Sequence, residues 1–289
     1  YIGQNELGGY VTKAWYWKTN ENNTSTLTLY NGQKEITINC PKNATLTENG
    51  DGTFTVKKVY GTVADYYTYD ENGNNLCSKM AYLDKEGNVE HVVSETNNTF
   101  DSFNNMLTSD SISYDKNGNI TWQDARVYEY DNAGKNTYTK TIMKDYSITQ
   151  TISTMEEYFN SDGLSSHTQS DTTLDGVPTY KNKTVRNVDE NGNPVSDTIT
   201  DFIYENGKIK SITIRTYSSS TNNMTKNTIE IPEGATVTEN ETGTFTVTNA
   251  DGSCTVYDSQ GNETFDSEFT EKEEVGSAEH IGKLINDCI

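Results

Sequence analysis

Apolar and polar residues alternate with a period of two along most of this chain. Phe54 and Val56 form one such pair, and Ile212 and Ile214 form another, with threonine between their members. Successive side chains of a strand point to opposite faces of a sheet, so this pattern predicts strands with one apolar and one solvated face. We therefore expect an all-β protein, an elongated antiparallel meander of repeated β-hairpins.

Two adjacent tyrosines interrupt the clean alternation. Tyr66 and Tyr67 place aromatic rings on both faces of the same predicted strand. Two interpretations follow: the sheet is covered on both sides at this point, or it presents an exposed aromatic strip.

A short unit recurs between the predicted strands. It consists of an apolar or aromatic residue, Asp, two variable residues, Gly and usually Asn. The full copies begin at Tyr69, Leu83, Tyr114, Tyr130, Val188 and Tyr257. In a hairpin, the Asp carboxylate caps the turn, the next two residues form a type I turn, and Gly takes the left-handed conformation of a G1 bulge. The turn centres lie about 14 to 16 residues apart or near twice that, which we interpret as two strands of about five to seven residues per interval.

Degenerate or shortened copies of this unit begin at Phe159, Leu174 and Tyr204. Two Thr- and Asn-rich segments, 94–105 and 217–223, carry no copy of the unit and are the best candidates for loops.

A longer segment of the chain is duplicated. Residues 41–56 and 232–247 match at 11 of 16 positions, at an offset of 191 residues. An alternating strand precedes each copy, and an aromatic-Asp turn follows it. The duplication predicts two related modules near the two ends of the chain.

These observations divide the chain into three parts: an N-terminal β module (1–75), a hairpin-repeat region (76–211) and a C-terminal β module (212–289) related to residues 27–75. A short helix is expected at the C-terminal end, where Ser277 is a candidate cap. An apolar stripe with helical spacing follows that cap, formed by Ile281, Leu284, Ile285 and Cys288. We expect this helix to cover a sheet edge.

Composition supports strands and turns and excludes some partners. Of 289 residues, 43 are Thr and 33 are Asn but only 10 are Leu, a balance that disfavours helices. The formal net charge of -21 repels nucleic-acid phosphates and anionic lipid surfaces. The sequence therefore predicts no nucleic-acid partner.

The cellular compartment is inferred from the N-terminal sequence, from the apolar runs and from the cysteines. No apolar run has the length of a membrane helix, and Tyr1 is not an initiator Met. We therefore expect that an N-terminal leader preceded Tyr1 and was removed. Attachment to a membrane by a lipid anchor, directed by that leader, stays open. Cys40, Cys77, Cys254 and Cys288 form no metal-binding spacing, and their redox state and pairing stay open. Cys40 ends an alternating strand and is expected to be a small buried residue.

The Tyr-Asp-x-x-Gly-Asn unit at Tyr69, Tyr114 and Tyr257 resembles the YD repeats of bacterial Rhs-type surface proteins and teneurins. The resemblance covers roughly residues 60–262. It implies β-hairpins that follow one another on a secreted or surface-exposed chain. This chain departs from the family in having Asn or Lys where Arg usually follows the Gly, in its irregular spacing, and in lacking a toxin or protease cassette. The acidic, Asn-, Thr- and Tyr-rich sequence is also similar to cell-envelope lipoproteins of Gram-positive gut bacteria.

Candidate chemistry is sparse. Asp115, Asn117 and Asn119 alternate oxygen atoms that suit calcium, but a Gly at position four fits a hairpin turn and not an EF-hand loop. We predict no metal and no cofactor. Trp15 and Trp17 share one face of a strand at about 6.6 Å; they are either core residues or a stacking platform for sugars.

Catalytic motifs are also absent from the sequence. The three histidines, His91, His167 and His280, lie in unrelated contexts, and no nucleophile elbow or phosphate-binding loop occurs. We interpret the chain as a non-catalytic, extracytoplasmic bacterial surface protein that binds partners or serves as a structural module. Envelope or host glycans and surface proteins are the expected partners. A carbohydrate-binding module that uses Trp15 and Trp17 is the first alternative, and a glycan-processing enzyme with a carboxylate pair is the second.

Overall fold

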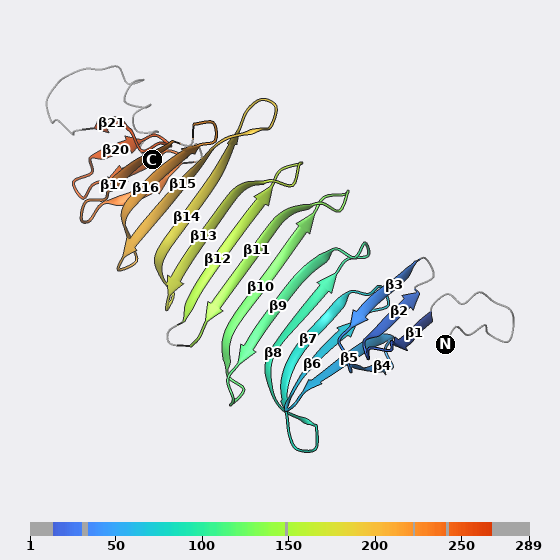
Figure 1. Cartoon of the computed structure of the whole chain (residues 1–289). Coiled ribbons are helices and arrows are strands. Elements are labelled where there is room, and N and C mark those ends of the chain that lie inside the picture. Colours follow the sequence, from blue (N-terminus) through green and yellow to red (C-terminus); the bar gives the residue numbers. More distant parts are fainter. Residues whose placement is uncertain (1–13, 31–33, 148–149, 222, 241–242, 268–289) are drawn as a thin grey trace, which may run out of the picture. The chain divides into compact units, whose positions relative to one another are not determined.

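The computed structural model describes residues 14–30, 34–147, 150–221, 223–240 and 243–267 (Figure 1). The described residues form 21 antiparallel strands and no helix. The prediction of an all-β meander of hairpins is therefore confirmed, while the predicted terminal helix, with Cys288 and His280, lies outside the described residues. The chain divides into two compact units, residues 1–152 and 153–289.

The first unit contains a small sheet and the start of a longer one, with strands in sequence order. The small sheet comprises β1 (Ala14–Thr19), β2 (Ser25–Tyr30) and β3 (Glu35–Cys40). The longer sheet comprises β4 (Thr45–Asn49), β5 (Thr53–Tyr60), β6 (Val63–Tyr69), β7 (Asn75–Leu83), β8 (Val89–Phe100), β9 (Met106–Tyr114), β10 (Ile120–Tyr130) and β11 (Asn136–Asp145).

The hydrophobic core of the first unit lies between these two sheets, at the β4–β6 end. Leu27, Leu29 and Cys40 of the small sheet pack against Phe54 and Val56 of β5. The predicted burial of Cys40 is thus confirmed, and burial raises the pKa of its thiol. The N-terminal part of this unit is a two-layer sandwich.

The second unit has the same parts in the opposite order. Its first sheet comprises β12 (Thr151–Phe159), which begins at the boundary between the units, β13 (Ser165–Leu174), β14 (Val177–Val188), β15 (Pro194–Glu205), β16 (Lys208–Ser218) and β17 (Met224–Glu230). Its small sheet comprises β18 (Thr236–Glu239), β19 (Phe245–Thr248), β20 (Cys254–Tyr257) and β21 (Glu263–Ser267).

A second sandwich core lies between β15–β17 and the small sheet of this unit. It is formed by six buried side chains, Phe202, Ile212, Ile214, Ile229, Phe245 and Val247. The duplicated phenylalanines occupy equivalent places. Phe54 meets Trp15 edge to face with ring centroids 5.4 Å apart, and Phe245 meets Phe202 in the same manner at 5.8 Å.

The duplicated segment carries the chain from one sheet to the other in both units. Its opening turn is closed by the amide of Ala44, which donates to the carbonyl of Pro41, and by the amide of Ala235, which donates to that of Pro232. In the first unit this turn leads from the small sheet into the longer one, and in the second unit it leads out of the longer sheet. The same local sequence therefore builds each sandwich.

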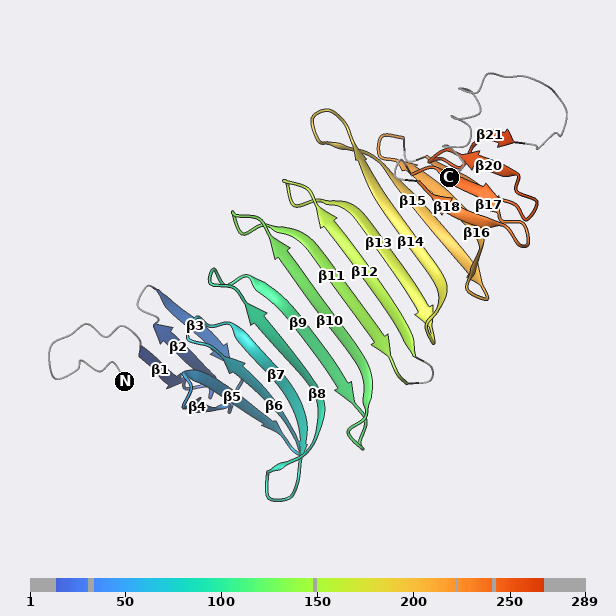
Figure 2. The ribbon, with the colours of Figure 1, turned by 180° about the vertical axis from the view of Figure 1, so that it is seen from behind.

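Beyond each sandwich the sheet continues as a single layer. Along β9 in the first unit and β13 in the second, nearly every residue is half-exposed, whichever face it is on. Figures 1 and 2 show no described segment across either face of β8–β11, and the same holds for β12 within the second unit. Turns of the small sheet reach over one face of β13 and β14, where Lys183 pairs with Glu239. In β8–β12, neither face is covered by a described segment.

Cross-strand side-chain pairs hold the single layer together in place of a core. Hydroxyl groups of Thr96 and Ser111 lie 2.8 Å apart in the first unit, and those of Ser153 and Thr172 lie 3.1 Å apart in the second. The Tyr114 hydroxyl donates to Glu95 at 2.6 Å, which raises the pKa of Tyr114 to about 12. Each such pair contributes roughly 0.2–1 kcal/mol, so the layer depends on many of them.

The two adjacent tyrosines are divided between the faces. Tyr67 packs against the sandwich core of the first unit. Tyr66 points to the other face, where the ammonium groups of Lys57 and Lys79 lie 5.3 and 4.9 Å from its ring centroid. Cation–π contacts, and not a second layer, accompany this ring.

The predicted hairpin turns are present, but the strands between them are longer than predicted. Glycine has a positive φ in each full copy of the unit, as at Gly73 (80°) and Gly118 (84°). The strands β8, β14 and β15 have 12 residues each, so the expected length of five to seven residues was wrong. Successive turns lie at alternate margins of the sheet, and each interval therefore holds one strand instead of two.

The loop expected at 94–105 is also corrected. Residues 94–100 belong to β8, and only 101–105 form a turn. This turn has the geometry of the repeated unit with Asn104 at φ 68° in the place of glycine. The unit was missed because Asn, which also tolerates the left-handed region, replaces the expected residue.

Candidate functional site

Three turns of the first unit follow one another along one margin of the sheet. They begin at Asp70, Asp101 and Asp131, spaced 31 and 30 positions apart in the sequence. The side-chain amide of Asn74 in the first turn donates to Oδ1 of Asn104 in the second, at 2.9 Å. The turns are therefore held side by side.

The turn at 101–105 is fixed by its own hydrogen bonds. Oδ1 of Asp101 accepts from the amides of Phe103 and Asn105 at 2.8 and 2.9 Å, and Oδ2 accepts from Nδ2 of Asn105 at 3.0 Å. The amide of Asn104 donates to the carbonyl of Asp101 at 3.1 Å. These contacts leave the side chain of Phe103 outside the network that forms the turn.

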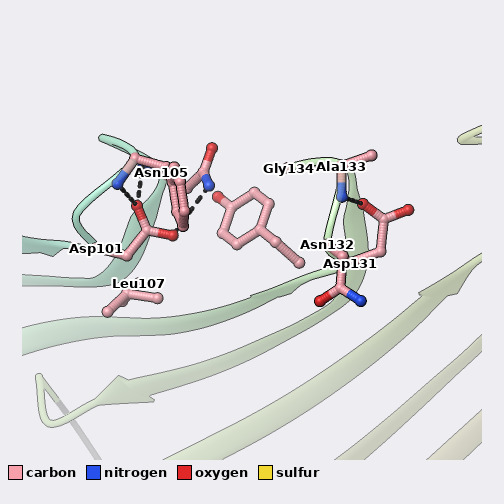
Figure 3. A pocket seen from close by; sticks show the side chains of 9 residues that line it. Asp101, Asn105, Leu107, Asp131, Asn132, Ala133 and Gly134 are labelled. Atoms are coloured by element: carbon pink, nitrogen blue, oxygen red, sulfur yellow. Dashed lines mark hydrogen bonds between the residues drawn. The ribbon is translucent and has the colours of Figure 1, made fainter.

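A pocket of about 490 Å³ lies between this turn and the next. Figure 3 shows Asp101 and Asn105 on one turn, and Asp131 to Gly134 on the other. The full set of lining residues is Asp101, Phe103, Asn105, Leu107, Tyr130, Asp131, Asn132, Ala133 and Gly134. Aromatic, carboxamide and carboxylate groups thus converge there, and none of these residues is basic.

The two carboxylates of the pocket, Asp101 and Asp131, accept hydrogen bonds from amides of their own turns. Partial burial acts to raise the pKa of Asp101, but the hydrogen bonds from Asn105 and Phe103 outweigh it and hold the pKa below its ordinary value. Asp131 accepts from the amides of Ala133 and Lys135 at 2.9 Å each. Asp101 is therefore ionised at neutral pH and serves as a hydrogen-bond acceptor.

The second unit has a groove of about 560 Å³ between the inner face of β13–β15 and the turns of its small sheet. Nζ of Lys183 lies 2.6 Å from Oε1 of Glu239, and Nζ of Lys181 lies 3.6 Å from Oε2 of the same residue. Burial, and then the nearby charge of Lys183, lower the pKa of His167. Glu239 is therefore engaged within the protein by two lysines.

The predicted stacking residues Trp15 and Trp17 are half-buried and pack against the core cluster of the first sandwich. Tyr16 between them points to the opposite face and is 43% exposed. The structure thus places both tryptophans on the inner face of β1, and their role in binding sugars stays a prediction.

The other candidate residues do not come together into one site. His91 stacks on Tyr82, with ring centroids 4.8 Å apart, in the first unit, whereas His167 lies in the second. The carboxylate of Asp115 accepts from the amides of Asn117 and Asn119 within its own turn. Among the residues that the structure describes, no group of three or more His, Cys, Asp or Glu side chains is placed to hold a metal ion.

Sequence analysis missed Phe103, the most exposed large apolar residue described, at 82%. Two signals pointed to it. The run from Phe100 to Asn105 reproduces the repeated unit with Asn104 for Gly, and the interval of about 30 residues between the Asp70 and Asp131 turns leaves room for one turn between them.

Comparisons with known proteins find little. No family model matches the chain, and no curated protein does. A porin-like protein from Bacteroides vulgatus ATCC 8482 aligns with 71% of this chain and 96% of its own, with 12% identity and a TM-score of 0.28. A porin-like protein from Bacteroides uniformis ATCC 8492 aligns with 72% and 83%, with 13% identity and a TM-score of 0.27.

The part of the chain that the structure describes contains no helix of the length and apolar character needed to span a membrane.

Proposed function

We propose that this chain is an exported bacterial surface protein that acts as a non-catalytic binding and interaction module. The observation that carries the proposal is the single-layer sheet, whose strands leave residues half-exposed on both faces in β8–β11 of the first unit and β12 of the second. A second layer would bury apolar area at about 25 cal/mol per Å². Strands that forgo that stabilisation leave both of their faces available to partners.

Charge supports a binding role. The net charge of -21 keeps the open faces soluble and discourages association between copies. The same charge favours neutral or basic partners over anionic ones.

The state of the carboxylates argues against the glycan-processing alternative. A glycosidase needs a general acid whose pKa is raised. In the pocket of the first unit, hydrogen bonds hold the pKa of Asp101 below its ordinary value, and Asp131 is engaged by amides of its own turn. Asp101 is therefore suited to accept hydrogen bonds and not to donate a proton.

Carbohydrate binding is the second candidate function. The specific observation that favours it is the same pocket, in which the exposed Phe103 and the half-buried Tyr130 stand beside carboxamide and carboxylate groups. Most ligand sites combine apolar walls with a few placed polar groups in this way.

The proposal is tested on intact producing cells and on the purified chain together. A protease that cannot enter cells should digest the protein on intact cells. The purified chain, incubated with cellulose, xylan or mannan, should release no reducing ends. Protection of the chain until the cells are lysed would contradict the surface location, and accumulating reducing ends would contradict the absence of catalysis.

A further inference from the structure

Phe103 is the residue at which one turn departs from all the others. It occupies the third position of the repeated unit, counted from Asp. The residues at the same position in the other turns of this kind are Asn72, Glu86, Asn117, Ala133, Asp162, Asn191 and Gln260. Polar or small side chains therefore suffice there.

The turn does not need the aromatic ring. Its third residue contributes only a backbone amide, donated by Phe103 to Asp101 at 2.8 Å and by Asn117 to Asp115 at the same distance. The Phe103 ring is 82% exposed, and leaving an aromatic ring in water forgoes its hydrophobic stabilisation. A role outside folding accounts for the ring.

The surroundings of Phe103 are pre-organised. The Tyr130 hydroxyl donates to the carbonyl of Met106 at 2.9 Å, which fixes the ring of Tyr130 in the wall of the pocket. Asn74 holds the 101–105 turn from its other side through Asn104. Because these groups are already ordered, a ligand is bound at a smaller entropic cost.

Polar groups in the pocket match hydroxyl groups of a ligand. Oδ2 of Asp101 accepts one hydrogen bond from Asn105, and a carboxylate oxygen accommodates two. Asn105 and Asn132 add carboxamides that donate and accept. Ala133, at the position equivalent to Phe103 in the next turn, leaves the space between the turns open.

We propose that this pocket binds a neutral saccharide, with one sugar ring stacked on Phe103. Sugar rings offer an apolar face to the aromatic ring and hydroxyl groups to Asp101, Asn105 and Asn132. Two carboxylates and no basic lining residue select against uronic or other acidic sugars. This inference rests on the proposed binding function and names its ligand class and site.

Calorimetric titration of the full chain tests the site, with cellohexaose, xylohexaose, mannohexaose and chitohexaose as probes and tetragalacturonic acid as the acidic counterpart. At least one neutral probe should bind, and the acidic one should not. Phe103→Asn restores the residue of three other turns and should weaken binding about tenfold or more while leaving thermal stability unchanged. Phe103→Trp should retain binding.

Two further variants make the result specific to this pocket. Ala133→Phe, which fills the space between the turns, should abolish binding, whereas Asn117→Phe, the same change on a turn without the pocket, should have no effect. Equal binding by the chain and by Phe103→Asn would overturn the site but leave the proposed binding function standing. Absence of binding to every neutral probe, or preference for the acidic one, would overturn the ligand class, and the surface and turnover tests would still judge the proposed function.

Discussion

Replacing Phe54 or Phe245 by alanine is expected to lower the free energy of unfolding of its own unit by about 3–5 kcal/mol. These rings are 5% and 2% exposed and lie at the centres of the two sandwich cores. Each replacement leaves a cavity and removes an edge-to-face contact with Trp15 or Phe202. Urea denaturation followed by circular dichroism measures the loss.

Phe103→Asn is the matched control, since it removes an aromatic ring from the surface. Its free energy of unfolding should stay within about 0.5 kcal/mol of the parent. If the two core variants were no less stable than this control, the sandwiches would not be the source of the chain's stability.

Gly73→Ala is expected to lower the free energy of unfolding by about 2–5 kcal/mol, from about 1–2 for the left-handed backbone and about 1–3 for overpacking. Gly73 has φ 80°. A Cβ added there would lie 2.6 Å from Cγ2 of Ile36, in the small sheet that covers this turn. A Cβ added at the equivalent Gly261 would lie 3.0 Å from Cδ1 of Ile214 and 3.1 Å from Cβ of Asn227, a milder crowding.

Gly118→Ala isolates the backbone contribution, because Gly118 has φ 84° and no atom within 4 Å of the added Cβ. Gly118→Ala should lower the free energy of unfolding by only about 1–2 kcal/mol. In a double-mutant cycle, Ile36→Ala should recover part of the loss caused by Gly73→Ala. Equal losses at Gly73 and Gly118, with no coupling to Ile36, would show that the turn does not pack against the small sheet.

Local chemistry made the turns and the strand type predictable. The Asp and Gly of each repeated unit specify the hairpin turn by hydrogen bonding and by backbone conformation. The turn can therefore be predicted from a single sequence. The burial of Cys40 was legible for a similar reason, since it continues an alternating strand whose duplicate has Ile231 at that place.

Features that depend on tertiary context were harder to predict from the sequence. Alternation predicts that a strand has two kinds of face but not whether a second layer covers one of them, so the single layer could not be distinguished from a sandwich. The predicted strand lengths were too short because the sequence does not show at which margin of the sheet a turn lies. The candidate site raises a different difficulty: Trp15 and Trp17 stand out as a cluster in the sequence, whereas Phe103 is conspicuous only once its turn is aligned with the others.

Beyond the first sandwich, in β8–β11, the sheet has two open faces, and cysteine labelling measures the exposure of each face directly. In a background with the four native cysteines replaced by serine or alanine, Thr108→Cys and Ser109→Cys place thiols on opposite faces of β9. Thr55→Cys and Val56→Cys do the same in β5, where Val56 is 0% exposed and faces the sandwich core.

If both faces of β9 are open, maleimide should modify the two β9 thiols at rates within about tenfold of each other. The Val56→Cys thiol should react at least about a hundredfold more slowly than that of Thr55→Cys, because it becomes accessible only through local unfolding. Protection of one β9 thiol comparable to that at position 56 would show a covered face and would contradict the single-layer sheet on which the proposed function rests.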